Sequence, residues 1–237
     1  MIGLDISDRS VKLVELSDEA EPRLLTACWS SLALNLVRRG VIQDVQAMAS
    51  HLTQAVQRCS PQPLSGRRLV ASIPERRSFV RVVEVPAMSD EETDEAVRWA
   101  VRQHIPFDLD RVYLDWQPLA GGRGGRLRSV LVGAVQRAVV DPLLAVVDSL
   151  GWQVVALELE AQAIVRSLLP RENTDVASVL LVDLGATTTN VIFFHRGAMR
   201  FTTSLKQGGD NLTQHLAAQL NLQPTVAAEK KALVGVR

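Results

Sequence analysis

Residues 180–194, LLVDLGATTTNVIFF, place an acid, a glycine and three threonines between two apolar runs. The apolar runs are rich in β-branched and aromatic residues, which predicts two strands joined by a short turn. In a structural interpretation, Gly185 supplies the positive φ that tight turns often need. In a functional interpretation the turn is a phosphate-binding loop, in which Asp183 holds a metal ion. Gly185 lets backbone N–H groups approach the anion, and the hydroxyls of Thr187 and Thr188 donate further hydrogen bonds to it. Other parts of the chain are needed to decide between the two.

A second unit with the same order of features opens the chain. Residues 3–16, GLDISDRSVKLVEL, run from an apolar strand through Asp5 and a polar turn into another apolar strand. Two such hairpins that face each other across a cleft would hold a polyphosphate from both sides. Asp5 and Asp183 would then hold Mg²⁺, mostly through water, and Lys12 would direct its ammonium group at the phosphates. The backbone N–H groups and hydroxyls expected to act as donors belong to Ser7, Ser10, Gly185, Ala186, Thr187 and Thr188.

Length and composition limit the classes of protein that fit. The 237 residues suffice for one large or two small domains, and 26 basic residues balance 26 acidic ones. A balanced charge predicts no general attraction to nucleic acid or anionic lipid. Cys28 and Cys59 lie far apart without a CxxC spacing, so we expect neither a disulfide framework nor a structural zinc site. No signal peptide and no run of about 20 apolar residues is found, which favours a soluble protein of the reducing cytoplasm.

Hydrophobic periodicity predicts alternating strands and helices in an α/β fold. Besides the two strands around Gly185, strands are predicted at residues 2–6, 11–16, 69–73, 79–85, 112–116, 127–135 and 154–157. Helices are predicted at residues 44–59, 89–104, 141–150, 160–168, 211–220 and 226–232. Ser89 and Glu92 form a capping box for the second of these helices, and Asp141 followed by Pro142 favours a helix start.

The block from residue 79 to residue 151 reads as a small α+β unit of its own. It holds three of the chain's few aromatic residues, Phe107, Tyr113 and Trp116. These side chains fill the core of the unit or line an apolar groove for a partner peptide. The glycine-rich segment GGRGGR at residues 121–126 invites an RNA-binding interpretation. No aromatic residues interleave with its arginines, which favours a hairpin loop instead.

Several segments, in order along the chain, resemble the PilM family of type IV pilus assembly proteins. They are IGLDIS, SVKLVELS, VEVP, LDW, LELEAQAI, LLVDLGATTTN, GGDNLT and AAEKK. The paired hairpins also resemble the phosphate motifs of the actin and sugar-kinase superfamily. The resemblance implies an actin-like (ribonuclease H-like) α/β fold of two lobes with an inserted FtsA-like α+β subdomain. It assigns residues 1–78 and 152–176 to the first lobe, 79–151 to the inserted subdomain and 177–237 to a second lobe whose C-terminal part is missing.

The same resemblance implies a cytoplasmic protein that binds ATP and Mg²⁺ and docks the N-terminal cytoplasmic tail of the membrane protein PilN. The tail would lie in a groove between the first lobe and the inserted subdomain, and the pair would connect the pilus motor to the inner-membrane ring. Gly208 and Gly209 would pass under the nucleotide, and Glu229 and Lys230 match the adenine side.

Two departures from the family pattern accompany this resemblance. The chain ends soon after AAEKK, where family members continue, so we expect either a fragment or a naturally short form with weakened nucleotide binding. The second departure is from the wider actin and sugar-kinase superfamily: Ser7 stands where many of its phosphate-binding members have Gly, and its Cβ restricts the approach of the loop to phosphate.

Two other functions stay open at this point. A small-molecule kinase of the same superfamily needs a carboxylate base near the acceptor hydroxyl, and Glu160, at the start of a predicted helix, is the candidate. A glutamate at a helix N-terminus is also favourable for its charge alone. FtsA-like self-association into filaments is the second alternative. We expect a nucleotide-binding scaffold with slow ATP hydrolysis at most.

Overall fold

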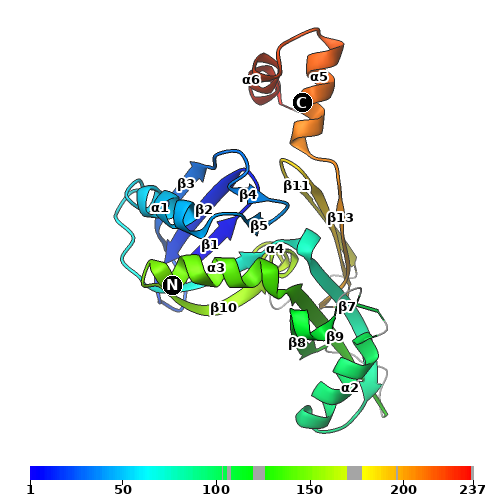
Figure 1. Ribbon diagram of the computed structural model, residues 1–237. Coiled ribbons are helices and arrows are strands. Elements are labelled where there is room, and N and C mark those ends of the chain that lie inside the picture. Colours follow the sequence, from blue (N-terminus) through cyan, green and yellow to red (C-terminus); the bar gives the residue numbers. More distant parts are fainter. Residues whose placement is uncertain (103, 106–107, 120–125, 170–177, 196, 236–237) are drawn as a thin grey trace.

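The computed structural model describes residues 1–102, 104–105, 108–119, 126–169, 178–195 and 197–235. Figure 1 shows a large sheet near the N-terminus, a separate sheet in yellow and orange, a green block at the lower end, and two helices at the upper end. Phe107 and most of the glycine-rich segment, residues 121–125, lie outside the described residues.

The largest sheet holds the opening hairpin in its centre. Its strand order is β10-β6-β1-β2-β3, in which β1 pairs with β2 in antiparallel and with β6 in parallel orientation. Alternating apolar and polar residues bury Ile2, Leu4, Val11 and Leu13 in one core. The bounds are Ile2–Ile6 for β1, Ser10–Leu16 for β2, Leu24–Ser31 for β3, Arg68–Ile73 for β6 and Gln153–Leu159 for β10.

Two helices pack against this core. They are α1 (Val45–Val56) and α3 (Arg137–Ser149), which also contact each other. Asp44 begins α1 as its N-cap, because its Oδ1 accepts a hydrogen bond from the backbone N–H of Ala47 at 2.9 Å. The short strands β4 (Val37–Arg38) and β5 (Val41–Ile42) pair beside them.

The start of α3 differs from the prediction. The helix begins at Arg137, directly after β9, so Pro142 lies inside it and does not mark its first turn. A proline within a helix removes one N–H donor, but Val139 and Val140 are buried in the core of the large sheet, and this burial offsets the loss. Consequently α3 packs with the first lobe, although its sequence lies within the block predicted as the insertion.

The inserted block forms a three-stranded antiparallel sheet of order β7-β9-β8, with α2 packed against it. The predicted capping box is confirmed, since the Ser89 N–H donates to Glu92 Oε2 at 3.0 Å and the Glu92 N–H donates to Ser89 Oγ at 3.3 Å. The bounds are Ser78–Pro86 for β7, Asp90–Arg102 for α2, Val112–Pro118 for β8 and Leu127–Gln136 for β9, with short 3₁₀ helices at Glu75–Arg77 and Leu109–Arg111.

The second lobe is an antiparallel sheet of order β11-β12-β13. The hairpin predicted around Gly185 is confirmed as β11 (Ser178–Leu184) and β12 (Thr189–His195), while β13 (Ala198–Leu205) was not predicted. Helix α4 (Glu160–Leu168) joins the two lobes, and α5 (Gly209–Gln219) and α6 (Pro224–Val234) pack on each other. None of the described helices is both long and apolar enough to cross a membrane.

The two cysteines are bonded, which corrects the expectation that they form no disulfide. Cys28 lies on β3, a strand that was not predicted, and Cys59 follows α1. Ala27 and Ser60 exchange backbone hydrogen bonds of 3.0 and 3.1 Å, and the Cα atoms of the cysteines lie 4.5 Å apart. The missed β3 pairing is therefore the reason that the sequence placed these residues far apart.

Candidate functional site

The two hairpin loops that were predicted to face each other meet in the structure. The loop between β1 and β2 and the loop between β11 and β12 line one gap with a cavity volume of about 70 Å³. Its wall also includes Pro74 and Arg76, which follow β6, the first residue of α4, and Gly40 and Asn190. The predicted site residues that line it are Asp5, Ser7, Glu160, Asp183, Gly185, Ala186, Thr187 and Thr188.

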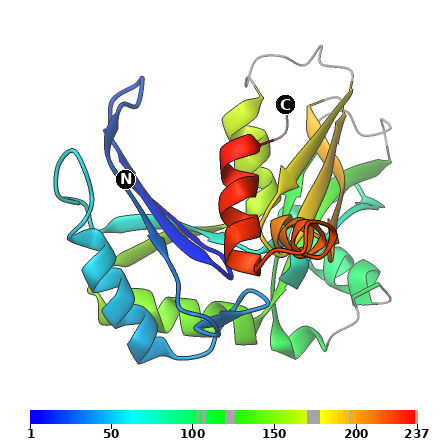
Figure 2. The ribbon, with the colours of Figure 1, turned by 90° about the horizontal axis from the view of Figure 1, so that it is seen from above.

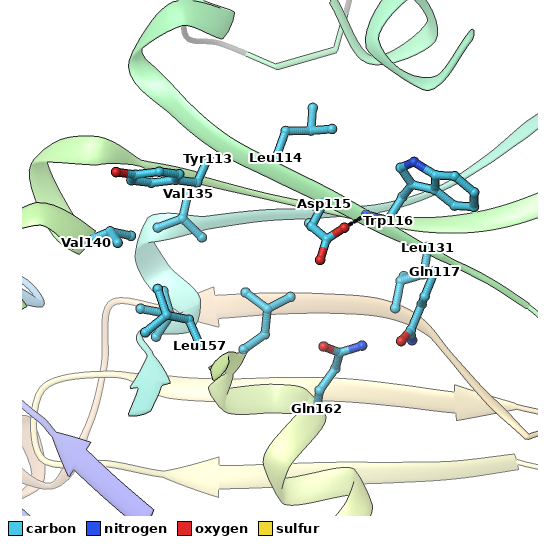
Figure 3. A pocket seen from close by; sticks show the side chains of 13 residues that line it. Tyr113, Leu114, Asp115, Trp116, Gln117, Leu131, Val135, Val140, Leu157 and Gln162 are labelled. Carbon is cyan, nitrogen blue, oxygen red and sulfur yellow. Dashed lines mark hydrogen bonds between the residues drawn. The ribbon is translucent and has the colours of Figure 1, made fainter. Parts of the chain in front are cut away.

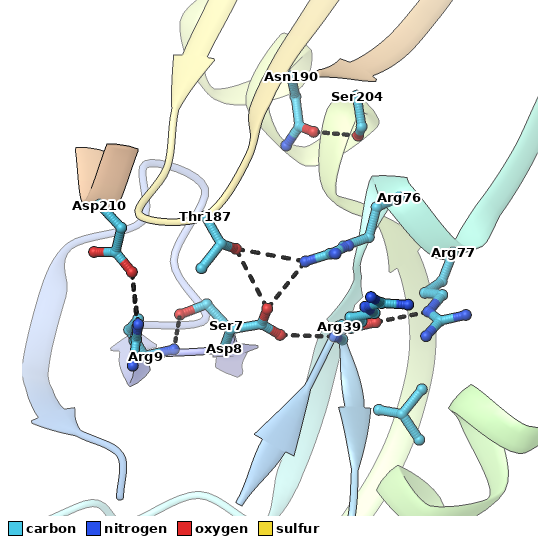
Figure 4. Close-up of polar contacts among 12 residues, drawn as sticks. Ser7, Asp8, Arg9, Arg39, Arg76, Arg77, Thr187, Asn190, Ser204 and Asp210 are labelled. Atoms are coloured by element: carbon cyan, nitrogen blue, oxygen red, sulfur yellow. Dashed lines mark hydrogen bonds and ion pairs between the residues drawn. The ribbon is translucent and has the colours of Figure 1, made fainter. Parts of the chain in front are cut away.

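Asp8, which the sequence analysis did not single out, joins the two loops. Its Oδ2 accepts hydrogen bonds from Arg76 at 3.0 Å and from the Thr187 hydroxyl at 3.3 Å, and its Oδ1 accepts from the Gly40 N–H at 2.7 Å (Figure 4). The side chains of Asp8 and Arg76 are only 15% and 22% exposed, so their ion pair is less screened than a surface pair. A guanidinium, a hydroxyl and a backbone N–H are also the groups that bind phosphate oxygens. The Asp8 carboxylate thus occupies an anion-binding position.

A second ion pair also crosses between the lobes. Nε and one terminal nitrogen of Arg9 donate to Asp210 Oδ2 at 3.2 and 2.6 Å. Both side chains are about 40% exposed, so the pair contributes little to stability. It ties the first loop to the N-terminus of α5; Arg9 lines the gap, whereas Asp210 does not.

Ser7 closes its own turn. Its Oγ accepts from the backbone N–H groups of Ser10 at 3.1 Å and Arg9 at 3.4 Å, and donates to the Ser10 carbonyl at 3.1 Å. Two N–H groups that a phosphate loop would present to its ligand therefore already have an acceptor within the protein. Ser7 satisfies them in the place where a glycine would leave them open.

Lys12 and Ser10 lie away from the gap. Lys12 pairs with Asp5 Oδ2 at 3.1 Å, and the two side chains line a different cavity of about 720 Å³ on the sheet. Ser10 is buried and turns its hydroxyl to Ser7. The Asp5 Oδ1 atom accepts from the Ser72 hydroxyl at 2.6 Å. Asp5 is thus at the border between the gap and the larger cavity.

Glu160 lines the gap beside two aspartates. Burial, together with the negative charges of Asp5 and Asp183, raises the pKa of Glu160 to about 7, although a hydrogen bond from the Glu75 N–H opposes the rise. Asn190 holds the group in place, because its side-chain amide donates both to Glu160 Oε2 at 3.3 Å and to Asp183 Oδ2 at 3.1 Å. The result is a carboxyl group that can gain or lose a proton near neutral pH.

The start of α5 is fitted tightly to the second loop. The backbone N–H groups of Gly209 and Asp210 donate to the carbonyls of Gly185 and Ala186 at 2.9 and 2.8 Å. A Cβ at position 208 would lie 2.6 Å from both carbonyl oxygens, which only glycine avoids. Gly208 and Gly209 therefore lie directly against the loop, as a segment that passes under a ligand in the gap would.

Two residues that the resemblance assigned to the adenine side lie on the surface. Glu229 and Lys230 are exposed on α6, and their side chains form no hydrogen bond with the described residues. Their neighbour Lys231 does connect to α5, because its Nζ donates to the Gly209 carbonyl at 2.8 Å and to the Thr213 hydroxyl at 2.7 Å.

The donor chemistry of the gap fits Mg²⁺ and phosphate, whereas its present volume does not fit a nucleotide. Asp5 on β1 and Asp183 on β11 both line the gap, and one or two carboxylates that act mostly through water are the usual protein contribution to a Mg²⁺ site. Within the described residues no group of three or more His, Cys, Asp or Glu side chains could hold a metal directly. The gap of about 70 Å³ is also far smaller than the roughly 300 Å³ or more of small-molecule sites. Asp5, Glu160 and Asp183 also line the adjoining cavity of about 720 Å³, whereas phosphate binding within the gap itself would require the Asp8 bridge to open.

A larger groove lies between the inserted sheet and the first lobe. We call it the subdomain groove; it has a volume of about 480 Å³ (Figure 3). One wall is the consecutive segment of β8 from Tyr113 to Gln117, and the facing wall holds Leu157 and Leu159 of β10. The remaining lining residues are Ile73, Leu131, Gly133, Val135, Val140 and Gln162. Tyr113 and Trp116 thus line a groove, as one of the two sequence interpretations expected, and Trp116 also packs on the inserted core.

Comparison with known proteins gives matches along nearly the whole chain. The family model for type IV pilus assembly protein PilM matches residues 3–235. The cell division protein FtsA of Streptococcus pneumoniae serotype 2 (strain D39 / NCTC 7466) is 24% identical over an alignment 254 residues long. The alignment covers 98% of this chain and 55% of FtsA. The chain therefore spans about half the length of this curated relative.

Two solved structures extend the comparison. The PilM-PilN type IV pilus biogenesis complex aligns with a TM-score of 0.85 and 26% identity over 98% of this chain and 68% of that chain. MreB 5 of Spiroplasma citri bound to AMPPNP aligns with a TM-score of 0.50 and 14% identity over 100% of this chain and 63% of that chain.

These matches agree with the arrangement of the molecule. Two lobes whose hairpin loops meet at one gap, with an inserted three-stranded subdomain, form an actin-like fold. Figure 2 shows the opening hairpin in blue and α6 in red. The match to the family model extends over far more than half of the sequence. The chain belongs to the type IV pilus assembly protein PilM family.

Proposed function

We propose that this protein is an adaptor of type IV pilus assembly that docks the N-terminal tail of a PilN-like membrane protein in the subdomain groove. Family membership and the similarity to a PilM-PilN complex support a PilN-like partner. Such a partner would hold the protein at the cytoplasmic face of the inner membrane and connect it to the pilus machine.

The observation that carries this proposal is the chemistry of the subdomain groove. Its floor is apolar and comes from both the inserted sheet and the first lobe, including Leu131, Val135, Leu157 and Leu159. Asp115, Gln117 and Gln162 supply polar groups along the same groove. An apolar floor with a few polar groups at its edge suits a short extended peptide, whose alternate side chains point inward.

The gap between the hairpin loops is the proposed site for ATP with Mg²⁺. Asp5 and Asp183 would hold the ion through water, and the Thr187 and Thr188 hydroxyls would donate to phosphate oxygens. When bound, the nucleotide would replace the Asp8 carboxylate as the partner of Arg76. Nucleotide binding is therefore proposed to compete with the internal bridge between the lobes, and to adjust the relative position of the lobes with little turnover.

Calorimetric titration of a synthetic peptide that copies the PilN tail tests the docking proposal. Saturable 1:1 binding is expected. Gly133→Leu should weaken it about tenfold or more, because a side chain there enters the groove beside Leu159, whose Cδ1 would lie 3.3 Å from a Cβ at that position. Gln46→Leu on the exposed side of α1 adds the same side chain outside the groove and should leave the affinity unchanged. No saturable binding by the folded wild-type protein would refute the proposal.

A further inference from the structure

The strand β8 presents an open edge beside the subdomain groove. Within the described part of the chain it is the outer strand of the sheet β7-β9-β8 and pairs on one side only, with β9. Five consecutive residues of β8, Tyr113 to Gln117, line the groove. On β9 only the alternate residues Leu131, Gly133 and Val135 line the groove, so it lies over the face of the sheet that carries their partners Tyr113, Asp115 and Gln117. Leu114 and Trp116, which belong to the opposite face, also line the groove, so it extends to the outer edge of β8 as well.

The register identifies which backbone groups face outward. The Leu119 N–H donates to the Ser129 carbonyl at 2.9 Å, so this pair is of the hydrogen-bonded type. Hydrogen-bonded and non-hydrogen-bonded pairs alternate along an antiparallel ladder. Backbone hydrogen bonds to β9 are therefore made by Tyr113, Asp115 and Gln117. The backbone N–H and C=O groups of Leu114 and Trp116 point away from β9.

Most of the outward N–H positions are occupied or blocked within the protein. The Trp116 N–H donates to Oδ1 of the neighbouring Asp115 at 2.8 Å. The Val112 N–H donates to the Leu109 carbonyl, and Pro118 has no N–H to offer. Blocking by a charged side chain and a proline is how proteins prevent unwanted pairing at an exposed edge. Asp115 is exposed, so a competing acceptor can reach the same N–H.

We propose that the tail binds as an added strand along β8 and that its backbone carbonyl replaces Asp115 at the Trp116 N–H. This inference rests on the proposed docking function and specifies how the tail is held. Backbone pairing with Leu114 and Trp116 would fix the tail, and every second side chain would enter the apolar floor between Leu131 and Leu157. Asp115 then acts as a placeholder that covers the edge until the partner arrives.

A series of tail peptides, each with one backbone nitrogen methylated, tests the added strand. A methyl group removes one N–H donor, so affinity should fall about tenfold at every second residue of the paired segment and change little at the residues between. Binding of the unmodified peptide with no such alternation would overturn this inference while leaving the docking proposal intact. Absence of binding by the unmodified peptide would overturn the docking proposal itself.

Variants of Asp115 test the placeholder. Asp115→Ala leaves the Trp116 N–H free and should tighten tail binding about fivefold, the equivalent of about 1 kcal/mol for one internal hydrogen bond. Asp115→Asn keeps an acceptor oxygen and should bind like wild type. Glu84→Ala on β7 removes one negative charge from the far edge of the same sheet and should have no effect. Weaker binding by Asp115→Ala, or equal tightening by Ala and Asn, would contradict the placeholder role.

Discussion

Asp8 and Thr187 lie 179 positions apart in the sequence, and the Thr187 hydroxyl donates to Asp8 Oδ2 at 3.3 Å. Each residue belongs to one of the two hairpin loops, so this contact shows that the loops converge. It also shows that the gap between them is closed from within, because Arg76 donates to the same carboxylate oxygen at 3.0 Å. The protein thus has an anion of its own in the position that we propose for a phosphate.

Replacing the internal anion should open the gap to nucleotide. Asp8→Asn removes the charge that pairs with Arg76 but keeps an oxygen for the Gly40 N–H. Affinity for ATP with Mg²⁺, measured by calorimetry, should rise about tenfold, because a charge-assisted hydrogen bond contributes about 1.5 kcal/mol or more and no longer has to be broken. The nucleotide-free variant should unfold at a lower temperature than wild type.

Asp210→Asn is the matched control for this experiment. Asp210 also joins the two lobes by an ion pair, with Arg9, but it does not line the gap. The variant should bind nucleotide as wild type does. Unchanged nucleotide affinity in Asp8→Asn, or an equal rise in Asp210→Asn, would show that Asp8 does not compete with phosphate.

Asp183→Ala should weaken nucleotide binding only when Mg²⁺ is present. The Asp183 side chain accepts from Asn190, whose amide retains Glu160 Oε2 as an acceptor, so the variant should lose only about 1 kcal/mol of stability. Affinity for ATP should fall about tenfold or more with Mg²⁺ and much less with a chelator. Equal affinity for wild type and variant in Mg²⁺ would refute the metal role.

The contact between α5 and the second loop should tolerate no side chain at position 208. Gly208→Ala brings a Cβ to 2.6 Å from two backbone carbonyl oxygens, which cannot move aside cheaply. We expect a loss of about 1–3 kcal/mol in the free energy of unfolding, measured in urea. Gly209→Ala is the control, because its Cβ would lie 3.3 Å from the flexible end of Lys231 and at an ordinary contact distance of 3.7 Å from the Gly185 carbonyl oxygen. Similar stability of both variants would contradict this account.

Glu160 should make stability depend on pH. Its pKa is raised from 4.5 in the unfolded chain to about 7 in the folded protein, so between these values only the folded state holds the proton. The bound proton therefore adds to the free energy of unfolding. This stabilisation is fully present below about pH 4.5 and is lost as pH rises through about 7, and it amounts to no more than about 3 kcal/mol. Denaturant unfolding from pH 5 to pH 8 should show this decline relative to Glu160→Gln. Glu95→Gln on exposed α2 should follow wild type, and parallel pH profiles for wild type and Glu160→Gln would contradict the prediction.

Both hairpins were predictable because each places an acid between two apolar runs of strand length. Their convergence was predictable from the fold of the family that several segments resemble in order along the chain. The role of Asp8 was not predictable from this pattern. Its partners Arg76 and Gly40 lie in other segments, and an aspartate in a polar turn has no periodic signal that distinguishes a bridge from a solvated side chain. The alternation of apolar and polar residues along β2 also does not reveal that the Lys12 side chain points to the cavity of about 720 Å³ and away from the gap.

The errors in the elements have definite causes. Pro142 was read as a helix start, but burial of Val139 and Val140 holds a full turn of α3 before it. The strand β3 was missed, and with it the pairing that places Cys28 beside Cys59. The open edge of β8 depends on the strand order of the inserted sheet, which no single segment of sequence contains.

Photo-crosslinking from the subdomain groove tests the central claim most directly. A photoreactive amino acid placed at Gln162 or Gln117, both of which line the groove, should cross-link to the PilN-like tail, and an excess of unlabelled tail peptide should abolish the product. The same group at Gln46, on the exposed side of α1, should give no cross-link. Cross-linking from Gln46 with none from Gln162 and Gln117 would contradict the account and place the partner on another surface.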